Sequence, residues 1–321
     1  MLHAFDTYSK WMQHFTSPPI KWCLKSRKFL FTVRPRKNFL WYFHTFVGLG
    51  FCSAGGAVVI LLSQIFDSYP PLTVAHIFLL VVVLCTAGTG FAINLGMILY
   101  GRECVEGWNV LLEMHAKLQR RGGRHPPSKK SLVWRILPAF VWALSSYPFV
   151  FSLAAIFFKL DPPYHILAIL NITHPLPHIF RFYIVCTIPA ELCRLLAFIA
   201  LFSISTPILL RDTLILLIRE NSTPVAAIVG RISCTRAISQ YRQVQIVMLS
   251  MEEFLGYSCF FVQALALLNS ILYNFVSLKF YATLPIWFYA IFPSMAVMTL
   301  VIIHVLMPGL HVVLDNSKKL L

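Results

Sequence analysis

The sequence predicts an all-α fold: a polytopic membrane helical bundle of six transmembrane helices with both termini in the cytoplasm. Six apolar stretches have about the length that is needed to cross a bilayer core of about 30 Å. Of the 321 residues, 58% are hydrophobic and only 12% are charged, whereas soluble domains carry about 25% charged residues. Most basic residues fall in alternate connections between the apolar stretches. Together these observations predict a chain that crosses the membrane several times.

Five of the six predicted spans contain no Asp, Glu, Lys or Arg. The first begins too far from Met1, and is too long, for a secretory signal peptide, so we interpret it as a true first helix. The spans are residues 39–66, 72–100, 136–158, 182–210, 254–278 and 283–307.

The distribution of Lys and Arg predicts which loops face the cytoplasm, because cytoplasmic loops are enriched in these residues. Eight precede the first span, eight lie in the loop 101–135, five lie in the loop 211–253, and two lie in the tail 308–321; together these are 23 of the 27. The segment 1–38 is therefore predicted to be a cytoplasmic N-terminal segment, followed by a transmembrane domain over 39–307 and a cytoplasmic tail.

The net charge of +15 raises the question of nucleic-acid binding. The basic residues lie in loops between apolar runs, however, and form no stripe on a soluble fold. Basic loops beside a bilayer are attracted to anionic lipids. We therefore predict membrane lipid as a partner and no nucleic acid.

The sequence contains no recognisable catalytic or metal-binding arrangement. The eight cysteines include no Cys-x-x-Cys pair, and no Gly-x-Ser-x-Gly turn occurs. His174 and His178 are spaced like metal ligands, but Pro175 and Pro177 interrupt the helix that would align their rings. We predict no enzyme activity, no cofactor and no metal.

Within the predicted spans, Glu191 and Arg194 are the residues of the types Asp, Glu, Lys and Arg, and both lie in the fourth span. Their i, i+3 spacing lets the side chains meet on one face of a helix. Charged groups at membrane depth face a bundle interior or a water-filled cavity. One interpretation is a polar lining for a ligand pocket or an ion route. The other, which we favour, is a self-neutralising pair near the outer half of the helix that serves packing.

Two short motifs bear on processing and location. Asn171-Ile172-Thr173 is a glycosylation sequon in the predicted outer loop, so Asn171 is a candidate acceptor. Lys318 and Lys319, the fourth and third residues counted from the end, match a cytosolic dilysine retrieval signal. Basic residues also follow a span on the inner side without any such role, which is the interpretation that we favour.

Small residues predict close packing between the first two spans. Gly50/Ala54 and Gly88/Ala92 are small-xxx-small pairs, a pattern that lets helices approach closely.

Short outer loops, a basic loop between spans two and three, and a partly helical segment between spans four and five together give the chain its layout. This layout, and the run from Ser239 to Val247 before the fifth span, resemble the arthropod chemoreceptor superfamily, the gustatory and odorant receptors. The resemblance implies a ligand pocket for a small tastant or odorant among the outer halves of the helices. It also implies a homo- or hetero-tetrameric ligand-gated cation channel in the plasma membrane.

Members of that family have a seventh helix with a Thr-Tyr-aliphatic-Gln-Phe signature that lines the pore, and residues 1–321 contain no such signature. We therefore expect a chemosensory-receptor-like membrane protein, with channel activity if a seventh helix is supplied. The alternative is a small multi-span transporter or an ER-resident membrane protein of an unrelated family.

Overall fold

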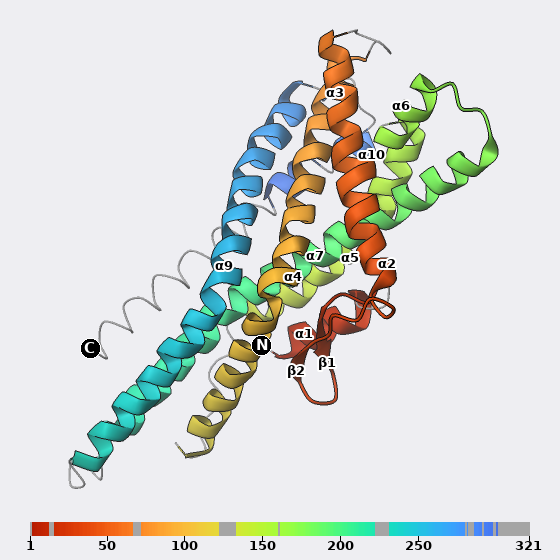
Figure 1. The fold of residues 1–321 in the computed structure, drawn as a ribbon. Helices are drawn as coiled ribbons and strands as arrows, with labels where there is room; N and C mark the ends of the chain where they lie inside the picture. Colours follow the sequence, from red (N-terminus) through yellow and green to blue (C-terminus); the bar gives the residue numbers. More distant parts are fainter. Residues whose placement is uncertain are drawn as a thin grey trace.

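The computed structural model is a bundle of long helices with a small N-terminal module against one side (Figure 1). Residues 39–66 form one continuous helix, made of α2 (Phe39–Phe43), the π-helical η1 (His44–Gly55) and α3 (Gly56–Phe66). These bounds coincide with the predicted first span. The structure describes residues 2–12, 16–66, 72–121, 133–159, 161–221, 231–279, 281, 286–290, 292–297 and 300.

Three helices are much longer than a bilayer requires: α4 (Val74–Arg121), α7 (Pro175–Asn221) and α9 (Arg231–Lys279). At 1.5 Å per residue each is about 70 Å long. Residues 101–121 were predicted as part of an inner loop, but they are helical. Residues 211–221 and 231–253 belong to the inner segment that was predicted to be partly helical, and they too are helical. All three extend the bundle well beyond the N-terminal module (Figure 1). Hydropathy detects only the apolar part of such a helix, because its polar continuation has no apolar run.

The remaining helices are shorter. α5 (Val133–Phe157) corresponds to the third predicted span, and α6 (Pro162–Ile169) lies within the predicted outer loop. α10 (Ile286–Tyr289) falls in the sixth predicted span, most of which lies outside the described residues, as do Lys318 and Lys319.

Five helices among the described residues are long and apolar enough to cross a membrane. Their outward faces carry large apolar side chains: Phe51 is 77% exposed, Phe149 72% and Ile271 67%. Exposed apolar surface on this scale marks contact with lipid or protein. The protein is therefore an all-α membrane-embedded bundle.

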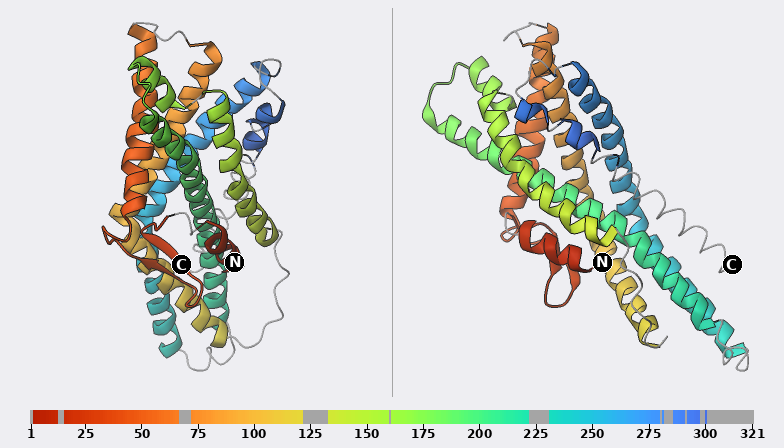
Figure 2. Two further views of the ribbon diagram at one scale, coloured as in Figure 1. Left: turned by 90° about the vertical axis from the view of Figure 1, so that its right-hand side faces the viewer. Right: turned by 180° about the vertical axis from the view of Figure 1, so that it is seen from behind.

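The N-terminal segment is a folded module, which the sequence did not predict. It consists of α1 (Leu2–Met12) and an antiparallel hairpin of β1 (Ile20–Cys23) and β2 (Lys28–Phe31), in which Trp22 pairs with Phe29. Alternate residues of the hairpin face the bundle, as strand geometry requires. Figure 2 shows the module against the side of the bundle, partway along the long helices.

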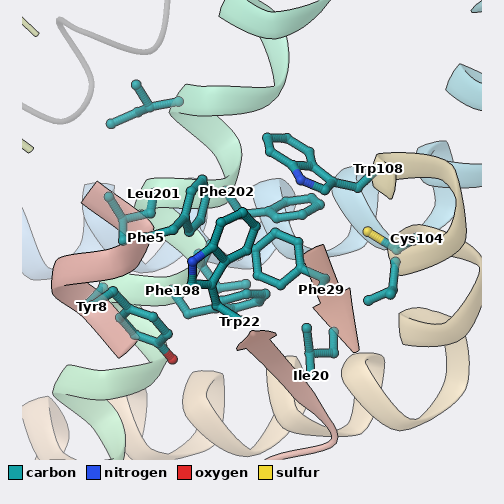
Figure 3. Close-up of a cluster of buried hydrophobic side chains, with 14 of the residues drawn as sticks. Phe5, Tyr8, Ile20, Trp22, Phe29, Cys104, Trp108, Phe198, Leu201 and Phe202 are labelled. Carbon is teal, nitrogen blue, oxygen red and sulfur yellow. The ribbon is translucent and has the colours of Figure 1, made fainter. Parts of the chain in front are cut away.

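Aromatic side chains join this module to the helices (Figure 3). Phe29 is 1% exposed and meets Trp22 at 5.0 Å, Trp108 of α4 at 5.8 Å and Phe202 of α7 at 5.7 Å between ring centroids. Phe5 of α1 stacks on Trp22 at 5.2 Å. Edge-to-face contacts of this kind stabilise a core beyond the area that they bury. The module is thus part of the main hydrophobic core.

A proline in α7 creates a link to α5. Pro189 has no N–H to donate, so the carbonyl of Val185, four residues earlier, lacks its helical partner. The hydroxyl of Ser152 on α5 donates to this carbonyl at 2.9 Å. The proline therefore opens a hydrogen-bonding position that ties two helices together.

Glycines allow α4 to approach its neighbours. At the predicted position Gly50 of the first span, a Cβ would lie 3.2 Å from the Phe91 ring of α4. A Cβ at Gly90 would lie 2.4 Å from the Leu192 side chain on α7. A Cβ at Gly88, the other predicted position, would meet no atom within 4 Å. The expectation of close packing at Gly88 is therefore wrong.

This difference gives a matched test. Replacing Gly90→Leu is expected to lower the melting temperature of the purified protein clearly, since overpacking a tight helix contact costs about 1–3 kcal/mol. Gly88→Leu introduces the same side chain two residues away and is expected to leave the melting temperature nearly unchanged. Equal effects of the two substitutions would contradict the described packing of α4 against α7.

Candidate functional site

Glu191 and Arg194 form a buried ion pair on α7. Arg194 donates to Oε2 of Glu191 from Nε at 2.8 Å and from Nη2 at 2.5 Å. The two residues are 3% and 1% exposed. The structure thus brings together the pair that the i, i+3 spacing predicted.

Residues from two other elements complete the surroundings of the pair. The hydroxyl of Thr16, which follows α1, donates to Oε1 of Glu191. His44 at the start of η1 places Nδ1 3.6 Å from the same oxygen, and its Nε2 lies 2.6 Å from the Tyr183 hydroxyl. Both carboxylate oxygens are therefore satisfied, and the pair joins the N-terminal segment, the first span and α7.

Tyr8 of α1 lies on the other side of Arg194. Burial raises the pKa of the Tyr8 hydroxyl, and the nearby positive charge of Arg194 opposes this rise. The phenol therefore stays protonated and neutral beside the guanidinium at physiological pH.

The structure places the ion pair beside Thr16 and His44, level with the start of the helix over residues 39–66. The sequence predicted a position near the outer half of the fourth span. The helix starts at Pro175, before that span, and Phe198 and Phe202 farther along are buried against the N-terminal module. Hydropathy cannot distinguish such core residues from lipid-facing ones.

A cavity of about 280 Å³ lies among the helices, near the lower end of the range of about 300–1,000 Å³ for small-molecule sites. Neither Glu191 nor Arg194 lines it, so the geometry favours the packing role for this pair. The walls of the cavity are mainly apolar and come from η1, α4, α5, α7 and α9. The lining residues include Leu79, Val82, Leu144, Phe151, Ile184, Leu192, Leu196, Ala266 and Tyr273.

Two polar atoms on the cavity walls have no hydrogen-bond partner in the part of the chain that the structure describes: Oγ1 of Thr86 on α4 and Oδ1 of Asn269 on α9. Asn269 is 6% exposed. Buried polar atoms in native proteins nearly always have a partner. Both residues belong to the cavity lining, so these oxygen atoms are groups of the wall that lack an internal partner. The sequence does not single them out, because Thr89, one turn away, looks the same in the sequence.

A second ion pair, between Asp161 and Arg181, lies at the edge of the cavity. Asp161, which caps the N-terminus of α6 and lines the cavity, accepts from Nε of Arg181 at 2.6 Å and from Nη2 at 2.8 Å. The Arg181 guanidinium also lies 4.7 Å from the centre of the Tyr164 ring. This bidentate pair fixes α6 to the start of α7. The sequence showed Arg181 only as one of the few basic residues outside the basic loops.

Asn171 lies apart from the cavity, in the turn between α6 and α7, and its side chain is exposed. Among the described residues, no group of three His, Cys, Asp or Glu side chains could hold a metal ion.

Comparison with protein-family models, with curated proteins and with solved structures gives no match. The case for a function therefore depends on the geometry of this chain and on its layout.

The buried ion pair makes a direct prediction about stability. Replacing Glu191→Gln leaves Arg194 buried without a counter-charge, and breaking a buried pair in this way costs about 3–5 kcal/mol. We expect a large fall in the melting temperature of the purified protein. The matched control is Glu106→Gln on α4. Glu106 forms an exposed ion pair with Arg102, with 3.1 Å between Oε1 and Nε, and exposed pairs contribute little to stability. Similar melting temperatures for the two variants would show that the Glu191 pair is not buried as described.

Proposed function

We propose that this protein is a chemosensory-receptor-like integral membrane protein that binds a small, mainly apolar molecule in the cavity between its helices. The observation that carries the proposal is the pair of unpartnered polar atoms, on Thr86 and Asn269, in residues that line a mainly apolar cavity. Small-molecule sites have this composition: apolar walls with a few polar groups that fix orientation.

The polar atoms define the ligand chemistry. Oδ1 of Asn269 accepts a hydrogen bond, so it favours a ligand with an O–H or N–H donor, while the Thr86 hydroxyl can donate or accept. The apolar walls favour a hydrocarbon body. A medium-chain alcohol meets both requirements, and a hydrocarbon of the same length meets only the second.

The layout supports the receptor class. The long helices α7 and α9, which contain the fourth and fifth predicted spans, continue past the N-terminal module, and the resemblance implies helices that project in this way. In the proposed orientation both termini are cytoplasmic and the protein lies in the plasma membrane. Cation-channel activity and tetramer formation belong to the proposal on condition that a seventh helix is supplied.

The proposal is tested by ligand-dependent stabilisation of the purified protein with nonan-1-ol and nonane as probes. A ligand that binds the folded state raises its melting temperature. We expect nonan-1-ol to stabilise the protein and nonane to do so much less. Asn269→Leu or Thr86→Val should weaken the effect of nonan-1-ol by about five- to tenfold in concentration, since one net hydrogen bond is worth about 1 kcal/mol.

The control variant is Thr89→Val, which makes the same chemical change on α4 outside the cavity lining. It should respond to nonan-1-ol as the unchanged protein does. Equal stabilisation by the alcohol and the hydrocarbon, or equal loss in Thr86→Val and Thr89→Val, would mean that the cavity does not recognise a ligand through these groups.

A further inference from the structure

A compact turn of basic residues precedes the first span. Arg34, Arg36 and Lys37 are all exposed, and the turn runs from the end of the β-hairpin to Phe39, where the helix begins. Lys21 on β1 is half-buried close by. Four cations are thus gathered where the chain enters the first span.

The turn has a fixed backbone. The Asn38 side chain accepts from the Arg34 N–H at 3.1 Å and donates to the carbonyl of Ser17 at 2.7 Å. The Asn38 N–H also donates to the carbonyl of Arg34 at 2.9 Å. Asn38 is 1% exposed. The three cations of the turn are therefore held on an ordered loop, so less conformational entropy is lost when they bind an anion together.

The positive charge of the turn is not neutralised within the part of the chain that the structure describes. Two other cations of the hairpin have acidic partners: Arg27 lies 3.7 Å from Asp6, and Lys28 lies 2.5 Å from Glu113. Arg34, Arg36 and Lys37 form no ion pair with a described carboxylate.

The same excess of positive charge affects the pKa of Lys21. Burial lowers its pKa, and the positive charges of Lys37 and Arg194 lower it further. A bound anion would relieve this repulsion.

Apolar side chains lie directly beside the cations. Phe39 is 64% exposed and Leu40 is 53% exposed, and both belong to the first turn of the membrane-crossing helix. A basic turn followed at once by exposed apolar residues matches the boundary between lipid headgroups and acyl chains.

We propose that this turn is a binding site for the phosphate-bearing headgroup of an anionic phospholipid in the inner leaflet. Arg34 and Arg36 can engage phosphate oxygens with paired N–H donors, Lys37 and Lys21 add charge, and Phe39 and Leu40 contact the acyl region. The choice of leaflet depends on the proposed cytoplasmic location of the N-terminus. The site is separate from the cavity and does not depend on the receptor assignment.

Native mass spectrometry of the full chain in detergent tests this site, with phosphatidylserine and phosphatidylcholine as probes. The unchanged protein should bind phosphatidylserine in preference to phosphatidylcholine. The triple variant Arg34→Gln, Arg36→Gln, Lys37→Gln should lose most of this preference, because each cation that is removed lowers the affinity for phosphatidylserine about fivefold. Its melting temperature should be unchanged, because the three side chains are exposed.

The matched control removes three exposed cations of α4 with Arg102→Gln, Lys117→Gln and Arg120→Gln. It should keep the preference for phosphatidylserine. Equal loss in both triple variants would show that total charge, and not this turn, attracts the lipid. A third arm adds inorganic phosphate: displacement of phosphatidylserine at a similar concentration would show a site for free phosphate and overturn the assignment to lipid.

Discussion

The buried ion pair of Glu191 and Arg194 is the constraint on which the rest of the arrangement depends. Removing two charges from water costs several kcal/mol per ion, and their attraction offsets this cost only when the geometry is good and the remaining hydrogen-bonding positions are filled. Here Arg194 donates twice to one oxygen of Glu191, and Thr16 donates to the other. The N-terminal segment is therefore needed to complete the site, and this requirement holds it against α7.

α7 presents different faces to the N-terminal module and to the cavity. At 3.6 residues per turn, Glu191, Arg194 and Phe198 lie along one face of the helix, and the cavity-lining residues Leu192 and Leu196 lie on another. Pro189 adds the free carbonyl of Val185 that Ser152 fills from α5. One helix thus holds the module, the cavity wall and the neighbouring helix in register.

The features that depend on composition could be predicted from the sequence. Long apolar runs predicted the bundle and the start and end of the helix over residues 39–66, and the spacing of Glu191 and Arg194 predicted their contact. The packing of Phe198 and Phe202 against the N-terminal module could not be predicted, because these residues have the same hydropathy whether they face lipid or the module. Residues 101–121 were predicted as a loop because the polar part of a helix has no apolar run by which the sequence could indicate it.

The candidate ligand site depends on packing between distant segments, which is why the sequence did not show it. Thr86 and Asn269 lie on different helices, and nothing in either local sequence indicates that an oxygen atom lacks a partner. The Trp22–Phe29 pairing of the hairpin was missed for a related reason: the strands have only four residues each, too few for a clear alternating pattern, and their inward face is defined by contact with α4 and α7.

The N-terminal module belongs to the core of the bundle through the Glu191 site. Amides exchange slowly where opening requires disruption of a packed core, so hydrogen exchange of the full chain, followed by mass spectrometry, measures whether the module is part of that core. Amides of α1 and of the hairpin, from Ile20 to Phe31, should exchange about as slowly as the middle of α7. Rapid exchange over both elements in the unchanged protein would mean that the module is not part of the core.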